Sequence, residues 1–141
     1  LRESLLRDQK FDYLVFDTSP GLQYSSINAI VTADFVAVAT TGDRSDVDGT
    51  KRMLSELYNL FEKKTGLVIN KVLDPSATSR RTELANKIKA EYKVPLLGIV
   101  PCFCEVLRAE GNLLFVQDKP DHPFTKIITE MAKKIEKDDI N

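Results

Sequence analysis

The sequence has 141 residues, 43% of them hydrophobic and 29% charged, which is typical of one soluble globular domain rather than a disordered chain. Its 20 lysines and arginines nearly balance its 21 aspartates and glutamates, so the bulk charge indicates no nucleic-acid or membrane partner. No apolar run approaches the ~20 residues that span a bilayer. Two cysteines make no disulfide framework, and we therefore expect a reducing, cytoplasmic location.

Four apolar runs of strand length alternate with longer helical patterns. The runs are continuous rather than alternating in polarity, which is typical of parallel strands that are buried on both faces. They lie at residues 13–16, 35–39, 66–70 and 95–100.

Amphipathic patterns predict the helices between these runs. In the stretch 45–64, Ser45 is the expected N-cap, and Asp46 and Asp48 suit the positive end of the helix. Further helices are predicted over 81–93 and 122–137, and a weaker one over 25–33. The order strand–helix repeated four times predicts an α/β three-layer sandwich with a mostly parallel sheet, formed by residues 1–141 as one domain.

Functional residues in such sheets lie beyond the carboxyl ends of the strands. This rule selects four segments: 17–21, 40–45, 70–76 and 101–105. In the first, "FDYLVFDTSPG", Asp17 follows an apolar run and can hold a magnesium-bound water beside a phosphate pocket. Gly21 would let the turn approach a phosphate closely. The alternative is a plain turn or helix start, where Asp, Ser, Pro and Gly are all favoured.

The second segment does not provide a phosphate loop. In "GDRSDVDGTK" six residues separate the glycines, and Thr50 comes before Lys51, whereas a P-loop has four residues between its glycines and Lys directly after. Three aspartates would also repel a polyphosphate. We interpret this stretch as a helix start, and no other segment of the sequence comes closer to a P-loop.

The last two segments offer candidate base-binding groups. The amide of Asn70 provides both a donor and an acceptor, which match the edge of adenine, although an asparagine there also suits a turn. Pro101 opens a loop that contains Cys102 and Cys104. These thiols are either half of a metal site completed by a symmetric partner or, as we expect, two reduced cysteines. His122, the only histidine, is expected at the surface beside a helix start.

Together these segments resemble the MinD/ParA family of P-loop ATPases, which have a deviant Walker A loop. "FDYLVFDTSPG" looks like the family's Walker B strand and switch II, "GLVINKV" like its adenine-contacting strand end, and "VPLLGIVPCFCEV" like its base-covering loop. The resemblance implies that Asp17 is the magnesium-linked acid, that Thr18 and Gly21 belong to switch II, and that four residues contact the nucleotide base: Asn70, Pro101, Cys102 and Phe103.

The resemblance begins partway into the family's domain. It implies that the Walker A loop, the switch I acid and the N-terminal strands would precede Leu1, and the absence of an initiator Met fits this expectation. The chain would then be the C-terminal portion of a MinD/ParA-like domain. The family usually has acidic residues after the proline of the base loop, where Cys102 and Phe103 stand here. The polar ending "KKIEKDDIN" gives no reason to expect the amphipathic membrane helix that many family members use.

We therefore expect part of an ATPase that binds ATP or ADP with Mg²⁺ in its complete form, forms a homodimer, and meets a regulatory protein partner. Cell division, partitioning and metal-cluster delivery remain open as its task. The chain by itself is predicted to be inactive. The alternative is a stand-alone regulatory or adaptor protein that has the fold without nucleotide hydrolysis.

Overall fold

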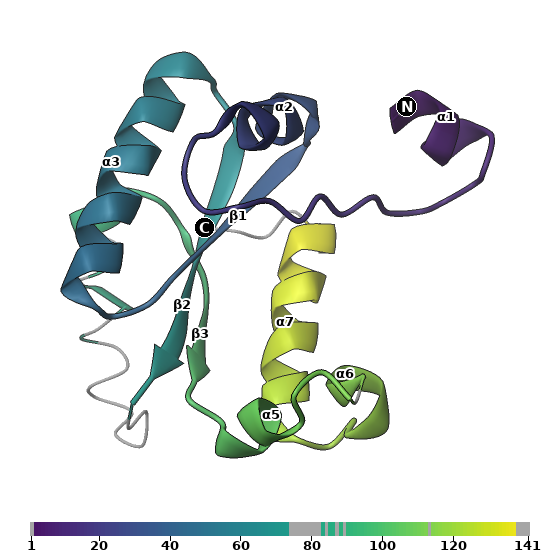
Figure 1. Ribbon diagram of the computed structural model, residues 1–141, viewed down its shortest axis with the longest axis vertical. Helices are drawn as coiled ribbons and strands as arrows, with labels where there is room; N and C mark the ends of the chain where they lie inside the picture. The colour runs from purple at the N-terminus through teal and green to yellow at the C-terminus, as the bar shows by residue number, and fades with distance from the viewer. Residues whose placement is uncertain are drawn as a thin grey trace.

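Three parallel strands form the sheet of this protein. The structure is a computed structural model that describes residues 2–73, 83, 85–86, 88, 90–112 and 114–137. Among these residues the strand order is β1-β2-β3, with β2 in the centre (Figure 1). The strands are β1 (Phe35–Thr40), β2 (Lys64–Val72) and β3 (Leu96–Pro101). Each lies on an apolar run that the sequence predicts as a strand.

The sheet is covered on both faces, which explains the continuous apolar character of its strands. On one face, Leu67 and Ile69 of β2 belong to a core that includes Leu54 of helix α3 (Arg44–Leu60) and Ile88. On the other face, Val68 packs with Met131 of helix α7 (Pro123–Lys137). Figure 1 shows α3 and α7 on opposite sides of the strands. The predicted three-layer α/β sandwich is thus confirmed.

Of the remaining helices, α1 (Arg2–Arg7) stands apart from the sheet, α2 (Tyr24–Thr32) lies near β1, and α5 (Cys104–Arg108) and α6 (Phe115–Asp118) lie beside the lower end of α7 (Figure 1). The residues described between 83 and 92 are helical, as the sequence predicts for 81–93, whereas the segment 74–82 lies outside the described residues. None of the described helices is both long and apolar enough to cross a membrane.

The predicted first strand, residues 13–16, is wrong for this structure. Residues 11–19, here called the N-terminal arm, are extended but pair with none of the described strands. Figure 1 shows the arm crossing from α1 to α2 above α7. A strand needs a hydrogen-bonding neighbour, and among the described residues β1 pairs with β2 alone. The apolar run is therefore present without the ladder that would make it a strand.

The start of α3 also differs from the prediction. The helix begins at Arg44, so its N-cap is Asp43 rather than Ser45, and the Asp43 side chain makes no capping hydrogen bond. The Thr41 hydroxyl accepts a hydrogen bond from the Asp43 N–H at 3.2 Å and donates to Asp46 Oδ2 at 2.5 Å. The helix ends at Leu60, four residues before the predicted end, because β2 already begins at Lys64.

Gly98 of β3 allows α7 to approach the sheet closely. A Cβ atom added at Gly98 would lie 2.7 Å from Met131 Cγ and closer still to Met131 Sδ. Met131 is itself buried against the sheet, together with Leu97 and Val100, so it has little room to move aside. The absence of a side chain at position 98 therefore fixes the distance between α7 and β3.

We expect Gly98→Ala to lower the free energy of unfolding by about 1–3 kcal/mol, because the added methyl overpacks the interface with Met131. Gly49→Ala is the matched control. Gly49 lies within α3 with open space around its Cα, so alanine there should raise stability by about 0.5–1 kcal/mol. Urea denaturation measures both changes, and equal effects of the two substitutions would contradict this packing.

Candidate functional site

The predicted base-contacting residues come together at the carboxyl ends of β2 and β3. Val72 pairs with Pro101 in the register of the two strands, and the Cys102 N–H donates to the Val72 carbonyl at 3.0 Å. This extra hydrogen bond continues the ladder past the end of β3. The backbone of Pro101 and Cys102 is thereby fixed beside the end of β2, which contains Asn70.

Asn70 is half-buried and lies within β2, at the irregularity in its pairing with β3 between Ile69 and Val72. Its Oδ1 accepts a hydrogen bond from the Lys71 N–H at 2.9 Å, and Lys71 has a positive φ of 56°. This bond uses one lone pair of the side-chain carbonyl and neither of the two amide N–H donors. Asn70 thus lies within β2 rather than in the turn that the sequence offered as an alternative, and this hydrogen bond does not use its amide donors.

Asp17 and Thr18 stand exposed at the end of the N-terminal arm, and the following turn is anchored to α2. The hydroxyl of the fully buried Ser26 donates to the Ser19 carbonyl at 3.2 Å. Gly21 has a φ of +85°, a backbone conformation that residues other than glycine rarely adopt. The sequence analysis missed Ser26, although a serine in the first turn of an expected helix was a visible signal.

A cavity of about 670 Å³ separates this turn from the sheet. The turn lines one side of it, and the other sides are formed by the middle of β1 and the first turns of α3, including Ser45, Asp46 and Thr50. Asn70 and the loop after Pro101 do not line this cavity. The structure therefore gathers the predicted site residues into two groups, one around Asp17 and one around Asn70, rather than into a single pocket.

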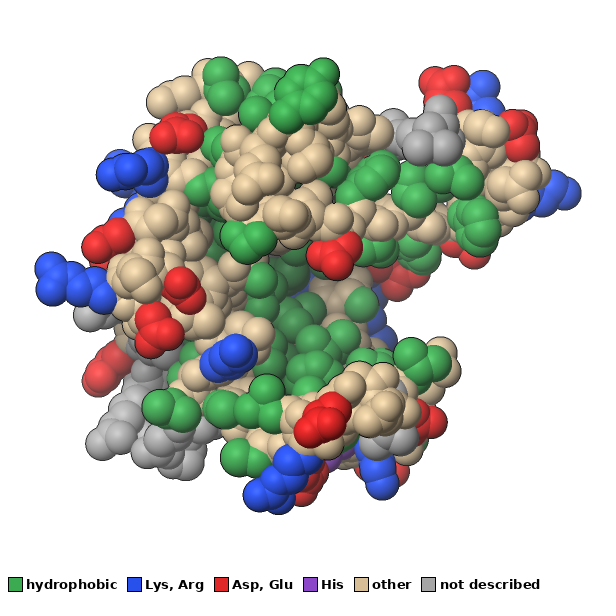
Figure 2. All heavy atoms as spheres, viewed as in Figure 1, with side chains coloured by type: hydrophobic (Ala, Val, Ile, Leu, Met, Phe, Trp, Pro, Cys, Tyr) green, Lys and Arg blue, Asp and Glu red, His purple; other side chains and the backbone are tan. Residues whose placement is uncertain are grey.

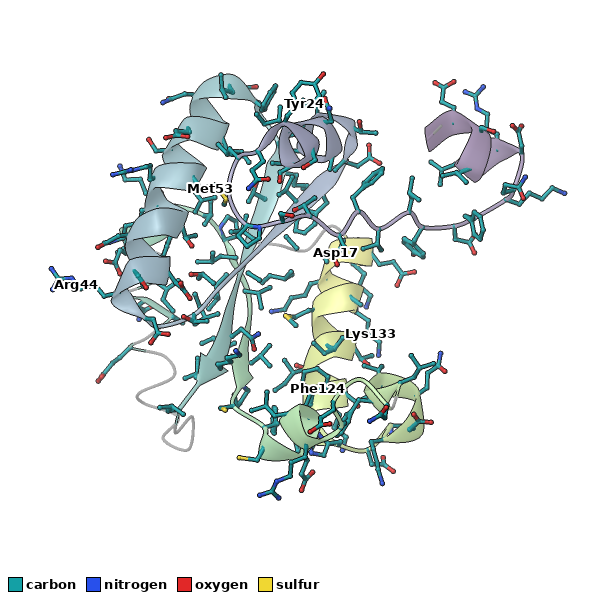
Figure 3. The ribbon with its side chains drawn as sticks, viewed as in Figure 1. Asp17, Tyr24, Arg44, Met53, Phe124 and Lys133 are labelled. Atoms are coloured by element: carbon teal, nitrogen blue, oxygen red, sulfur yellow. The ribbon has the colours of Figure 1, made fainter. Side chains whose placement is uncertain are left out.

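The groups around Asp17 suit magnesium held through water. Carboxylate and hydroxyl oxygens are the donors that Mg²⁺ prefers, and it usually keeps several waters. No three His, Cys, Asp or Glu side chains converge on a metal position within the described parts of the chain. An exposed carboxylate such as Asp17, with room for solvent beside it, fits this outer role (Figure 3). The same finding gives Cys102 and Cys104 no further ligands among those residues.

Three hydroxyl groups meet at the end of β1. The Thr50 hydroxyl donates to Thr40 Oγ1 at 2.9 Å, and the Tyr92 hydroxyl lies buried nearby without a hydrogen-bond partner in the described structure. Burial raises the pKa of Tyr92 above its usual value of 10.0, and the neighbouring carboxylate of Glu91 raises the pKa further. The segment after β1 is thus a polar helix start, as we interpret it from the sequence.

A second cavity, of about 660 Å³, runs along the outer edge of β1 and is here called the edge groove. Residues 12–16 of the arm line one wall, and residues 33–37 line the other. The arm leaves large side chains in solvent, with Tyr13 68% and Val15 87% exposed. Figure 2 shows apolar side chains gathered in the recess beneath the arm. The Tyr13 hydroxyl donates to Glu136 Oε1 at 3.0 Å and ties the arm to α7.

His122 is the clearest residue that the sequence analysis misplaced. It does lie at a helix start, directly before α7, but its side chain is only 17% exposed. The ring is packed between Phe103 and Phe115, and its Nε2 lies 2.8 Å from Glu105 Oε2. Because these partners come from distant parts of the sequence, no local pattern around His122 signalled its burial.

Comparison with known proteins shows distant relatives. No family model matches the chain. The septum site-determining protein MinD of Synechocystis is 25% identical over 133 residues, which cover 93% of this chain and 50% of the relative. The protein of the same name from Bacillus subtilis is 29% identical over 107 residues, covering 74% and 39% respectively. The chain thus spans about half the length of the curated relatives that it matches.

Solved structures share the fold at low sequence identity. A MinD cell division protein from Aquifex aeolicus superposes with a TM-score of 0.80 at 16% identity, covering 99% of this chain and 59% of the other. A chain of the MinC:MinD cell division complex from the same organism also gives 0.80, at 15% identity and with 99% and 58% covered. A ParA family ATPase from Chlorobium tepidum gives 0.71 at 14% identity, covering 89% and 52%.

The raised pKa of Tyr92 predicts a loss of stability at high pH. The folded protein keeps the Tyr92 proton to higher pH than the unfolded chain does, so the unfolded chain ionises first. The contribution of Tyr92 to stability is therefore complete below pH 10 and is lost as pH rises through the folded-state pKa. Denaturant unfolding between pH 9 and 11 should show a smaller loss for Tyr92→Phe than for the wild type, whereas Tyr24→Phe, at an exposed position, should leave the profile unchanged. Identical profiles for all three proteins would contradict the burial argument.

Proposed function

The chain is related to the MinD and ParA ATPases, and from this premise we propose that it forms the base-side portion of a nucleotide-binding domain. In the complete protein this domain binds Mg-ATP and acts as a nucleotide-dependent dimerisation switch in the cytoplasm. Its task is cell division, partitioning or a related form of spatial regulation. The MinC:MinD complex among the similar structures supports a regulatory protein partner as well.

The edge groove is the observation that carries this proposal. β1 is hydrogen-bonded to β2 along one edge, and the arm lies across the groove from its other edge. Neighbouring strands lie about 4.8 Å apart, so a single inserted strand would hydrogen-bond to β1 on one side and to the arm on the other. We assign this place to the strand that leads into the family's phosphate loop. The insertion would also cover the exposed side chains of Tyr13 and Val15.

Each predicted site residue has a role in this arrangement. The magnesium ion, when bound, neutralises charge on the phosphates. Asp17 would orient a water bound to the magnesium ion, and Thr18 and Gly21 would belong to the turn that responds to the terminal phosphate. On the other side, the amide donors of Asn70 meet the base edge, and Pro101–Phe103 covers the base. A strand in the edge groove would bring the phosphates between these two groups.

A second candidate function rests on the same groove. A strand from a different protein fits it as well as a strand of the protein's own, because β-strand addition depends mainly on backbone hydrogen bonds. The chain would then be an adaptor that keeps the fold without hydrolysing nucleotide. Nucleotide measurements on the complete protein separate the two functions.

We expect no magnesium-dependent phosphate release from ATP by the 141-residue chain, because catalysis of phosphoryl transfer depends on the phosphate loop and its lysine. The complete protein should hydrolyse ATP, and Asp17→Ala in it should abolish most of this turnover. Turnover by the chain alone that disappears with Asp17→Ala would show that its phosphate site lies elsewhere. If the complete protein neither binds nor hydrolyses ATP, the ATPase function is excluded and the adaptor function is the one supported.

Asn70→Ala should weaken the binding of Mg-ATP to the complete protein by about 1–3 kcal/mol, because the hydrogen bonds to the base edge are lost. Asn59→Ala, at an exposed position on α3, is the matched control and should leave the affinity unchanged. Isothermal titration calorimetry measures both values. Equal affinities for wild type and Asn70→Ala would remove Asn70 from the base site.

A further inference from the structure

Four rings form a cluster beneath the loop that follows β3. Phe103 lies 5.1 Å from the His122 ring and 6.0 Å from Phe124, between ring centroids. Phe115 of α6 approaches the same two rings at 4.9 and 5.8 Å. All four contacts are edge-to-face, the arrangement in which the positive edge of one ring meets the negative face of another. The cluster therefore joins the loop after Pro101 to α6 and to the start of α7.

The hydrogen bonds of His122 define how its ring is held. Its Nδ1 accepts a hydrogen bond from the Phe124 N–H at 3.1 Å, in the manner of a helix N-cap. A neutral imidazole that accepts at Nδ1 has its hydrogen on Nε2. That hydrogen points to Glu105 Oε2, 2.8 Å away in α5. The ring is thus fixed at both nitrogens, and one of the two bonds reaches the helix that directly follows the loop.

Phe103 connects this arrangement to the candidate base site. The Cys102 N–H donates to β2, so the backbone of the loop is attached to the sheet. The Phe103 side chain packs on His122, which gives the loop a second attachment. In Figure 3 Phe124 lies at the lower end of α7, beside α5 and α6. A displacement of the His122 ring would remove one of the packing partners of Phe103, which also contacts Phe124, and would so loosen the loop after Pro101.

We infer that His122 and Glu105 are positioning residues for the Pro101–Phe103 loop. They hold the loop in the conformation in which it can cover a purine base. The role of the loop in covering a base rests on the proposed nucleotide function. That the packed His122 ring holds the loop in place does not depend on that function. Nothing in the sequence around His122 assigns it this role.

The two residues do not contribute equally. The Glu105 side chain is 71% exposed, and an ion pair or hydrogen bond at such a position is weakened by water. The His122 ring is packed by aromatic side chains and largely shielded from solvent. We therefore expect the ring to supply most of the restraint and Glu105 to refine its orientation.

The chain contains its own reporters of loop position. Cys102 is half-buried inside the loop, and Cys104 is exposed at the start of α5. The rate at which iodoacetamide labels Cys102, measured by mass spectrometry and divided by the rate for Cys104, reports how often the loop opens. This measurement uses the 141-residue chain without nucleotide, so its result does not depend on the proposed function.

The informative variant is His122→Asn. Asparagine still caps α7 through its side-chain oxygen, but it removes the ring that packs on Phe103 and reaches Glu105. We expect the labelling ratio to rise about tenfold for His122→Asn and about twofold for Glu105→Ala, reflecting loss of a packed contact and of an exposed hydrogen bond. Glu130→Ala, which removes an exposed carboxylate from α7, is the control and should leave the ratio unchanged.

Two results would overturn the inference. One is an unchanged ratio in His122→Asn. The other is a raised ratio whose dependence on urea matches that of global unfolding, because His122 would then act only on overall stability. A separate titration with adenosine, followed by the amide signal of Asn70, tests the base site. No shift in the wild-type chain would count against the proposed function, while the labelling ratio still decides the role of His122.

Discussion

The unequal pairing of β1 and β2 is the constraint on which the rest of the structure depends. β2 has a hydrogen-bonded neighbour on each side, whereas β1 is paired on one side within the described residues and faces the edge groove on the other. Backbone donors and acceptors at a sheet edge invite pairing with another strand. The extended conformation of the arm, the exposure of Val15 and the separation of the two candidate sites all follow from this edge.

The two groups of site residues are stabilised by different means. Around Asn70, the backbone ladder between β2 and β3 continues as far as Cys102, so this part of the site is held by the sheet itself. Around Asp17, the turn is anchored by a single hydrogen bond from Ser26, and the arm before it has no ladder. The group around Asn70 is therefore held by the sheet, whereas the turn after Asp17 has no such ladder among the described residues.

The sequence predicts most of the fold because strands that are buried on both faces of a sheet appear in the sequence as continuous apolar runs. The apolar runs of β1, β2 and β3 and the stripe of α7 all form as predicted, and the family resemblance drawn from the motifs is confirmed by the comparisons. The run at 13–16 has the same pattern, but a strand also requires a partner, which local sequence cannot supply. For the same reason the environment of His122 was missed, since its contacts join residues that are distant along the chain. The roles of Asp17 and Asn70 remain predictions.

Amide hydrogen exchange, read residue by residue in the monomeric 141-residue chain, tests the unpaired edge most directly. The account predicts that residues 13–16 exchange nearly as fast as an unstructured peptide, while the β2 amides, paired on both sides, are protected up to the free energy of global unfolding. With a strand in the edge groove, as we propose, the same arm residues should become protected together with β1. Protection of residues 13–16 equal to that of β2 in the isolated monomer would contradict the account, because the arm would then already have a partner.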